Sequence, residues 1–211
     1  PGTAKNVLTI GASTTGAYSS QEVGQVYNSS SSSYTQDGRI KPDLVAPGVM
    51  ICSARAQEAQ FASGESCSEE IHEEGENPLY MTLSGSSMAT SVAAGASTMT
   101  RQFLREEMNI SEPRSDLIKA ILINGAMDLG DSDIPNPMEG WGQINVSQSL
   151  YPKSGDQNSN VHIDYSRSLL PGHSFVYTFD VTEDSKLDAT LVWNDKEGSA
   201  TGNQTNARLI N

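Results

Sequence analysis

A turn rich in glycine and serine precedes a run of small residues. Residues 83–91 read Leu-Ser-Gly-Ser-Ser-Met-Ala-Thr-Ser, and small side chains continue to Met99. We expect a helix that begins at about Ser87. The first turn of a helix has unpaired backbone N–H groups and a partial positive charge, both of which stabilise an oxyanion. Ser87 is therefore the candidate nucleophile of an acyl-transfer reaction.

The helix predicted over residues 87–106 begins with alanine, glycine, serine and threonine side chains. Small side chains allow neighbouring elements to approach closely. We therefore expect this helix to run through the middle of a packed core and to hold Ser87 rigidly.

The preceding chain predicts the elements that position this helix. An apolar run over residues 5–11 ends at glycine and indicates a buried strand, followed by a loop over residues 12–38. Prolines and a glycine in residues 39–48 fix a short connection that continues as a strand through Ile51. Residues 79–83 form a strand that leads into the serine turn.

A second helix is predicted over residues 117–123. Ser115 is its expected N-cap, Asp116 lies at its positively charged start, and Gly125 suits its C-terminal cap. Apolar residues cover most of its circumference, so we expect it to pack against a sheet. Residues 140–146 indicate a turn and a short strand.

The pattern changes after residue 152. Residues 161–165, 175–181 and 187–193 are β-rich runs separated by turn residues, at spacings of roughly a dozen residues. This spacing is typical of an antiparallel β-sandwich or jelly roll. We predict two domains, 1–152 and 153–211, of which the second is the beginning of a β-sandwich.

Charge excludes some classes of partner. The net charge is -13, whereas nucleic-acid binding needs a concentrated basic face. No apolar run reaches the roughly 20 residues of a membrane span. The acidic segment 55–78 is interpreted as a solvated loop. Calcium binding is the alternative for its carboxylates, although their spacing matches no calcium-loop motif.

The cysteines and sequons indicate a secreted, extracellular glycoprotein. Cys52 and Cys67 flank a polar segment, and a local disulfide is the natural interpretation in a secreted protein, with two free thiols as the alternative. Four Asn-X-Ser/Thr triplets are candidate glycosylation sites: Asn28, Asn109, Asn145 and Asn203.

The serine turn resembles the nucleophile motif of the subtilisin-like serine proteases, Gly-Thr-Ser-Met-Ala-Thr/Ser-Pro, with Ser86 in place of Thr and Ser91 in place of Pro. Residues 4–12, residues 37–48 with Lys-Pro-Asp and Ala-Pro-Gly, the Leu-Ile-Lys-Ala helix and the Gly-Trp-Gly turn are similar to family segments in the same order. The runs after residue 160 resemble the oxidant-stable alkaline protease subgroup. The resemblance implies an α/β fold, part of a parallel sheet with helices on both faces, followed by part of a β-sandwich.

The resemblance also implies hydrolysis of a protein or peptide substrate by a Ser-His-Asp triad. The family order is Asp, His, Ser, so both partners of Ser87 and the oxyanion asparagine are expected in an upstream segment. A serine without a base is a poor nucleophile, and His72, His162 and His173 stand in no motif and are assigned surface or structural roles. We therefore expect no protease activity from this chain alone.

Two further expectations come from the resemblance. Asp43, in the Lys-Pro-Asp segment, is expected to be structural rather than catalytic. A structural Ca²⁺ is also expected, with no catalytic cofactor. Four aspartates near the predicted strand ends are candidate ligands: Asp180, Asp184, Asp188 and Asp195.

Two alternative functions remain. A catalytically degenerate relative, serving as a structural or binding module, is favoured by Ser91 and by the altered loop at residues 27–34. A carbohydrate-binding β-module would depend on the jelly-roll pattern and on Trp193, which is more simply interpreted as a core residue.

Overall fold

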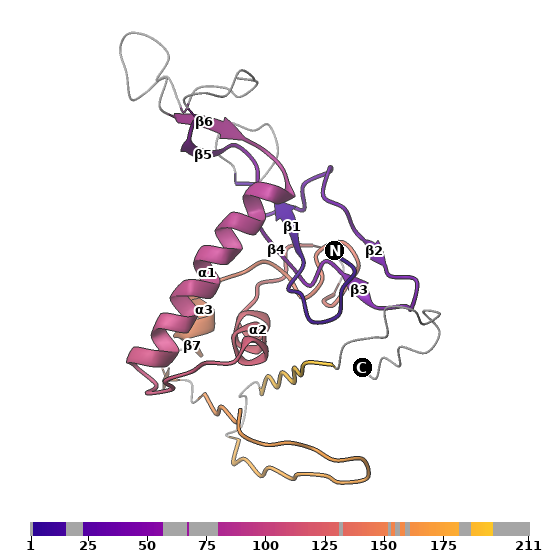
Figure 1. The fold of residues 1–211 in the computed structure, drawn as a ribbon, viewed down its shortest axis with the longest axis vertical. Coiled ribbons are helices and arrows are strands. Elements are labelled where there is room, and N and C mark those ends of the chain that lie inside the picture. Colours follow the sequence, from indigo (N-terminus) through magenta and orange to yellow (C-terminus); the bar gives the residue numbers. More distant parts are fainter. Residues whose placement is uncertain are drawn as a thin grey trace.

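Two parallel strands and a long helix form the centre of the molecule. The computed structural model describes residues 2–15, 23–56, 67, 80–130, 133–151, 153–154, 157–158, 161–181 and 187–195. β1 (Ile10–Ser13) pairs in parallel with β4 (Leu44–Pro47). α1 (Ser86–Glu106) packs across both strands (Figure 1). The predicted α/β class is therefore confirmed.

The core lies between α1 and these strands. α1 buries one face, formed by Ala89, Ala93, Ala96, Thr100 and Leu104. The first three pack with apolar residues of β1 and β4, and with Leu122 of α2 (Ser115–Asn124). α3 (Val146–Leu150) packs against both of the other helices. The small side chains of this face allow the helix to lie close to the strands. The sequence predicted a helix in the middle of the core, whereas in the described residues α1 buries only this face.

Short antiparallel pairs complete the secondary structure. β2 (Ser33–Tyr34) pairs with β3 (Ile40–Lys41), β5 (Ile51–Ala54) with β6 (Tyr80–Leu83), and β7 (Lys153–Ser154) with β8 (Gln157–Asn158). The strand predicted over residues 5–11 begins only at Ile10, because the Thr9 N–H donates to the Asp43 side chain instead of joining a ladder. The strand expected to continue through Ile51 is interrupted after Pro47.

The caps of α2 differ in detail from the prediction. Arg114, not Ser115, is the N-cap residue, and Ser115 is the first helical residue. Asp116 accepts a hydrogen bond from Leu117 N–H and pairs with Arg114, so the expected acid does lie in the first turn. Gly125 is the C-cap, but its φ is -96°. Glycine is needed there for space, since a Cβ would lie 2.4 Å from Ser149 Cα.

Residues 140–146 form a turn, as predicted, but the expected short strand is reduced to single bridges. Gln143 bridges to Val45 and to Met127, and α3 begins at Val146. Gly142 has a φ of +106°, and its Cβ would lie 2.6 Å from the Met127 carbonyl oxygen. This turn therefore closes tightly over the edge of β4.

The three runs after residue 160 form no strand within the described residues 161–181 and 187–195. Their side chains nevertheless associate. Tyr177 donates to Asp164 at 2.7 Å and stacks on Phe179, and Ile163 packs against the core cluster of Leu104, Ile110 and Leu117. The β-sandwich and the domain boundary at residue 152 stay predictions.

Candidate active site

The turn before α1 is fixed by the segment that follows β4. Gly85 N–H donates to the Gly48 carbonyl at 2.7 Å, and Met50 N–H donates to Ser84 Oγ at 2.8 Å. Gly85 has a φ of +144°, a conformation that favours glycine. A Cβ on Gly48 would lie 2.8 Å from both Ala12 Cβ and the Gly85 carbonyl oxygen. The Pro47–Gly48 pair was the only sequence signal for this contact, which the sequence analysis did not identify.

Ser87 is the second residue of α1, and its side chain is exposed. Met88 and Ala89 N–H both donate to the Gly85 carbonyl, at 3.1 and 3.2 Å. The amides of Ser86 and Ser87 precede these first helical bonds, so they point out of the helix start as donors. No acidic residue lies in the first turn. The arrangement can therefore stabilise an oxyanion formed at Ser87.

Ser91 and the altered loop at residues 27–34 are the two departures from the family pattern, and neither interrupts the hydrogen bonds of the local backbone. Ser91 lies within α1, and its hydroxyl donates to the Ser87 carbonyl at 3.2 Å. In the altered loop, Tyr27 N–H donates to the Ala12 carbonyl, and Ser30 Oγ accepts from Ala12 N–H. The helix therefore passes Ser91 without a break, and the loop still pairs with β1.

No histidine of the described residues lies near Ser87. His162 makes edge-on ring contacts with Tyr177 and Phe179, in the segment whose Ile163 packs against the core cluster that contains Leu104. Leu104 lies seventeen residues after Ser87 on α1, about 25 Å along the axis. Residues 161–181, the segment that includes His173, lie toward the far end of α1 from the serine turn (Figure 1). His72 lies outside the described residues.

Asp43 is buried in a network of charged groups. Its Oδ2 accepts from Lys41 Nζ at 2.6 Å and from Thr9 N–H at 2.7 Å, and its Oδ1 accepts from Lys119 Nζ at 2.7 Å. Burial lowers the pKa of Lys41, and the attraction of Asp43 offsets this only in part. The carboxylate thus joins the N-terminal segment, β4 and α2, which supports the structural role expected for it.

We predict that Asp43→Asn destabilises the chain by about 3–5 kcal/mol, because it leaves two ammonium groups without their common buried partner. Urea unfolding of the purified chain measures this effect. Asp37→Asn is the matched control, since Asp37 pairs with Arg39 at a more exposed position, and its expected cost is below about 1 kcal/mol. Equal costs for the two variants would contradict the structural role of Asp43.

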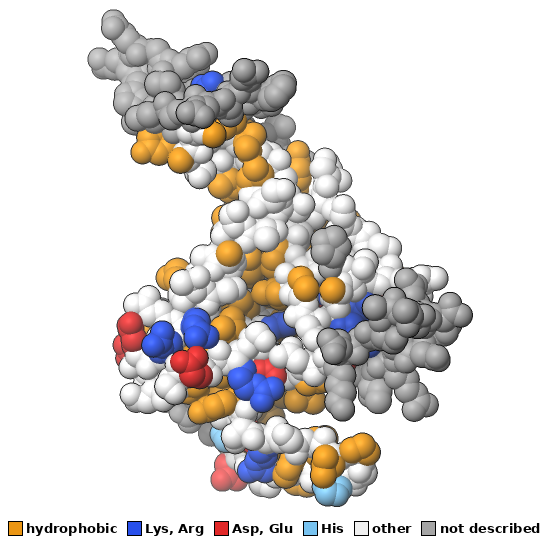
Figure 2. All heavy atoms as spheres, viewed as in Figure 1, with side chains coloured by type: hydrophobic (Ala, Val, Ile, Leu, Met, Phe, Trp, Pro, Cys, Tyr) orange, Lys and Arg blue, Asp and Glu red, His pale blue; other side chains and the backbone are white. Residues whose placement is uncertain are grey.

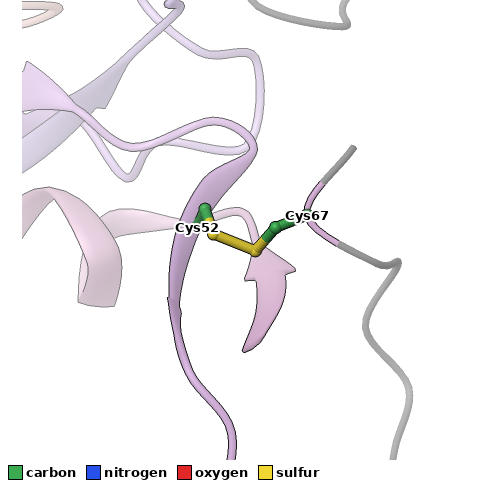
Figure 3. Close-up of a disulfide and its surroundings, with 2 residues drawn as sticks. All are labelled: Cys52 and Cys67. Carbon is green, nitrogen blue, oxygen red and sulfur yellow. A yellow bond between two sulfur atoms is a disulfide. The ribbon is translucent and has the colours of Figure 1, made fainter. Parts of the chain in front are cut away.

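Cys52 of β5 is disulfide-bonded to Cys67, as predicted (Figure 3). β5 pairs with β6, which leads directly into the serine turn, and Cys52 lies opposite Thr82. The disulfide therefore closes a loop next to the hairpin that delivers Ser87. The other residues of the acidic segment beyond Ala56 lie outside the described residues.

Among the described residues, no group of three or more carboxylate, histidine or cysteine side chains could hold a metal ion. Asp195 pairs with Lys5 at 3.5 Å, and Asp184 lies outside the described residues. The expected structural Ca²⁺ is therefore not supported by any described site and stays a prediction.

Two of the candidate glycosylation sites, Asn28 and Asn109, are exposed. The side chain of Asn145 caps α3 by accepting from Gln148 N–H, and Asn203 lies outside the described residues. Asn28 and Asn109 are therefore the better candidates.

The structure is that of an α/β protein with an exposed serine at the start of a helix that packs on parallel strands, an arrangement that would suit a nucleophile. The model of the subtilase family (Peptidase_S8) matches residues 1–142, and the chain belongs to this family of serine proteases. The resemblance drawn from the motifs is thereby confirmed.

Curated relatives are much longer than this chain. It is 30% identical over 220 residues to the serine protease/ABC transporter B family protein tagD of Dictyostelium discoideum, a match covering 79% of this chain and 12% of tagD. It is 31% identical over 150 residues to the serine protease AprX of Bacillus subtilis (strain 168), covering 71% of this chain and 31% of AprX. The chain thus spans less than a third of either relative.

Solved structures support the fold. The Clostridium perfringens CspB protease gives a TM-score of 0.53 at 24% identity, covering 72% of this chain and 27% of CspB. Fervidolysin from Fervidobacterium pennivorans, a keratinolytic enzyme related to subtilisin, gives a TM-score of 0.51 at 22% identity, covering 71% of this chain and 20% of fervidolysin.

In the part of this chain that the structure describes, no helix has the length and apolar character needed to cross a membrane.

Proposed function

We propose that this chain is the nucleophile-bearing part of a serine endopeptidase. The observation that carries the proposal is the exposed Ser87 hydroxyl beside the outward-pointing amides of Ser86 and Ser87, at a helix start free of acidic residues. Ser87 Oγ attacks the peptide carbonyl, and the resulting oxyanion is stabilised by the Ser87 amide. A histidine and an aspartate in an upstream segment, with an asparagine at the oxyanion, complete the centre.

In the proposed reaction that histidine transfers the proton. It accepts the proton of the Ser87 hydroxyl as the Oγ–carbon bond forms, and it gives the proton to the leaving amine as the peptide C–N bond breaks. Water then attacks the acyl-enzyme and regenerates Ser87. The substrate is a protein or peptide, and the Cys52–Cys67 disulfide supports a secreted or extracellular enzyme.

The test compares the full-length product of the gene with the purified 211-residue chain, both assayed on an unfolded protein substrate. We expect hydrolysis by the full-length protein, inhibition by a fluorophosphonate, and no hydrolysis by the isolated chain. Activity of the isolated chain would contradict an upstream base. An inactive full-length protein would favour the alternative, a degenerate subtilase that serves as a structural or binding module.

A further inference from the structure

Thr90, at the start of the second turn of α1, donates a hydrogen bond back to the serine turn. Its Oγ1 donates to the Ser86 carbonyl oxygen at 2.7 Å. In an α-helix this carbonyl also accepts the N–H of the residue four positions later, which here is Thr90 itself. Thr90 therefore supplies two donors to the Ser86 carbonyl oxygen, one for each of its lone pairs.

The peptide unit that receives this bond is the one that carries the proposed oxyanion donor. A peptide unit is planar and joins the carbonyl of one residue to the N–H of the next. The Ser86 carbonyl and the Ser87 N–H are thus two ends of one rigid group. A hydrogen bond accepted at the carbonyl polarises this group, so the N–H at its other end becomes a stronger donor. The same bond resists rotation of the plane and so fixes the direction of the N–H.

Other hydroxyls of α1 make bonds of the same type, which serine and threonine commonly form in helices. Ser91 donates to the Ser87 carbonyl at 3.2 Å. That peptide unit carries the Met88 N–H, which already donates to the Gly85 carbonyl. Further along the helix the bonds run from Ser97 to Ala93, from Thr98 to Ala94 and from Thr100 to Ala96. Among these bonds, that of Thr90 is the one that ends on the peptide unit of the Ser87 N–H.

The start of α1 carries no charged side chain of its own. Residues 86–100 contain none, and Arg101 is the first charged residue of the helix. Figure 2 shows the charged side chains beside α1 gathered toward its far end. A hydrogen bond to a charged group is about twice as strong as a neutral one. Because no such group of α1 lies beside the serine turn, a neutral hydroxyl contributes measurably to the polarisation of the Ser86–Ser87 peptide unit.

We propose that Thr90 is a positioning residue for the oxyanion donor of Ser87. Its hydroxyl holds the Ser86–Ser87 peptide unit in place and strengthens the Ser87 N–H as a donor. The inference rests on the proposed function, since the oxyanion forms only in acyl transfer. The substrate carbonyl carries less negative charge than the oxyanion, so a stronger donor stabilises the transition state more than the bound substrate.

The size of the effect follows from the donor that Thr90 strengthens. Loss of one whole oxyanion donor lowers kcat by about 10²- to 10³-fold. One hydrogen bond in a chain strengthens the next by about 10–30%. That fraction of the free energy behind the loss of a whole donor corresponds to about two- to eightfold in kcat.

Three variants of the full-length protein test this role: Thr90→Val, Thr90→Ser and Ser91→Ala. Valine keeps the branched shape of threonine without the hydroxyl, and Thr90 is exposed, so we expect the fold to be retained. Active sites are titrated with a fluorophosphonate, and kcat per labelled site and KM are measured on a peptide substrate. We expect Thr90→Val to lower kcat by about two- to eightfold with KM unchanged. Thr90→Ser is expected to restore kcat, and the matched control Ser91→Ala to leave it unchanged.

Several results would overturn the inference. An unchanged kcat in Thr90→Val would show that the hydroxyl does not act on the donor. An equal loss in Ser91→Ala, or no rescue by Thr90→Ser, would assign the effect to the helix in general. A raised KM in place of a lowered kcat would assign Thr90 to substrate binding.

The parent protein separates this inference from the proposed function. A folded parent that neither hydrolyses the peptide nor takes the label would contradict the proposed function, and the role of Thr90 with it. An active, labelled parent whose Thr90→Val variant has the same kcat would contradict the role of Thr90 alone.

Discussion

Ser87→Ala is expected to lower kcat for peptide hydrolysis by the full-length protein by about 10⁶-fold, the order of magnitude for removing a subtilase nucleophile. The loss is large because no other hydroxyl shares its position. The neighbouring Thr90 and Ser91 hydroxyls donate to helix carbonyls, at 2.7 and 3.2 Å, and follow the first turn. Steady-state kinetics on a peptide substrate, with purified variant and parent, measures the change.

Thr98→Ala is the matched control for this substitution. Thr98 lies eleven residues further along α1, is exposed, and donates its hydroxyl to the Ala94 carbonyl. Its replacement removes a hydroxyl from the same helix without touching the site, so we expect kcat within about twofold of the parent, since a weak surface bond is all that is lost. Retention of activity by Ser87→Ala would contradict the assignment of the nucleophile.

Gly48→Val is expected to have the second largest effect. The added Cβ would lie 2.8 Å from Ala12 Cβ and from the Gly85 carbonyl oxygen, and 2.9 Å from Ala89 Cβ. Since two of these atoms belong to the serine turn and to the first turns of α1, relief of the clash must move Ser87. We expect a destabilisation of about 1–3 kcal/mol from overpacking and a loss of about 10²-fold in kcat from misplacement.

The stability part of this prediction is measured by urea unfolding of the 211-residue chain, and the kinetic part with the full-length protein. Gly95→Ala is the control for stability in the isolated chain. No atom lies within 4 Å of its added Cβ, so alanine is expected to stabilise α1 by about 0.5–1 kcal/mol. Unchanged stability and kcat in Gly48→Val would show that the turn is not positioned through Gly48.

The long helix and its serine could be predicted from sequence because their signals are local. Gly85 supplies the positive φ that ends the turn, and the helix begins one residue later, at Ser86 rather than Ser87. The position of Gly48 against Gly85 and Ala89 could not be predicted, because it depends on the approach of segments about 40 residues apart. The prolines and the glycine of residues 39–48 predicted a short connection that continues as a strand, but not the contacts that Gly48 makes.

Strand boundaries were harder to predict because tertiary bonds override the local pattern. The strand predicted over residues 5–11 loses its first five residues, because Asp43, held by Lys41 and Lys119, accepts the Thr9 N–H. After residue 160, the alternation of apolar and polar residues predicts strands. Such strands form only where neighbouring strands provide partners for their backbone hydrogen bonds. In the described residues 161–181 and 187–195 no ladder forms, and Phe175, Tyr177 and Trp193 are 42–45% exposed.

The most direct test of Ser87 as the nucleophile is fluorophosphonate labelling of the full-length protein, followed by fragmentation of the peptide spanning residues 81–101. Localisation by fragmentation is needed because this peptide contains several other serines. We predict label on Ser87 and none on Ser84, Ser86 or Ser91. A folded full-length protein without label on Ser87 would contradict the proposed peptidase and favour the degenerate module.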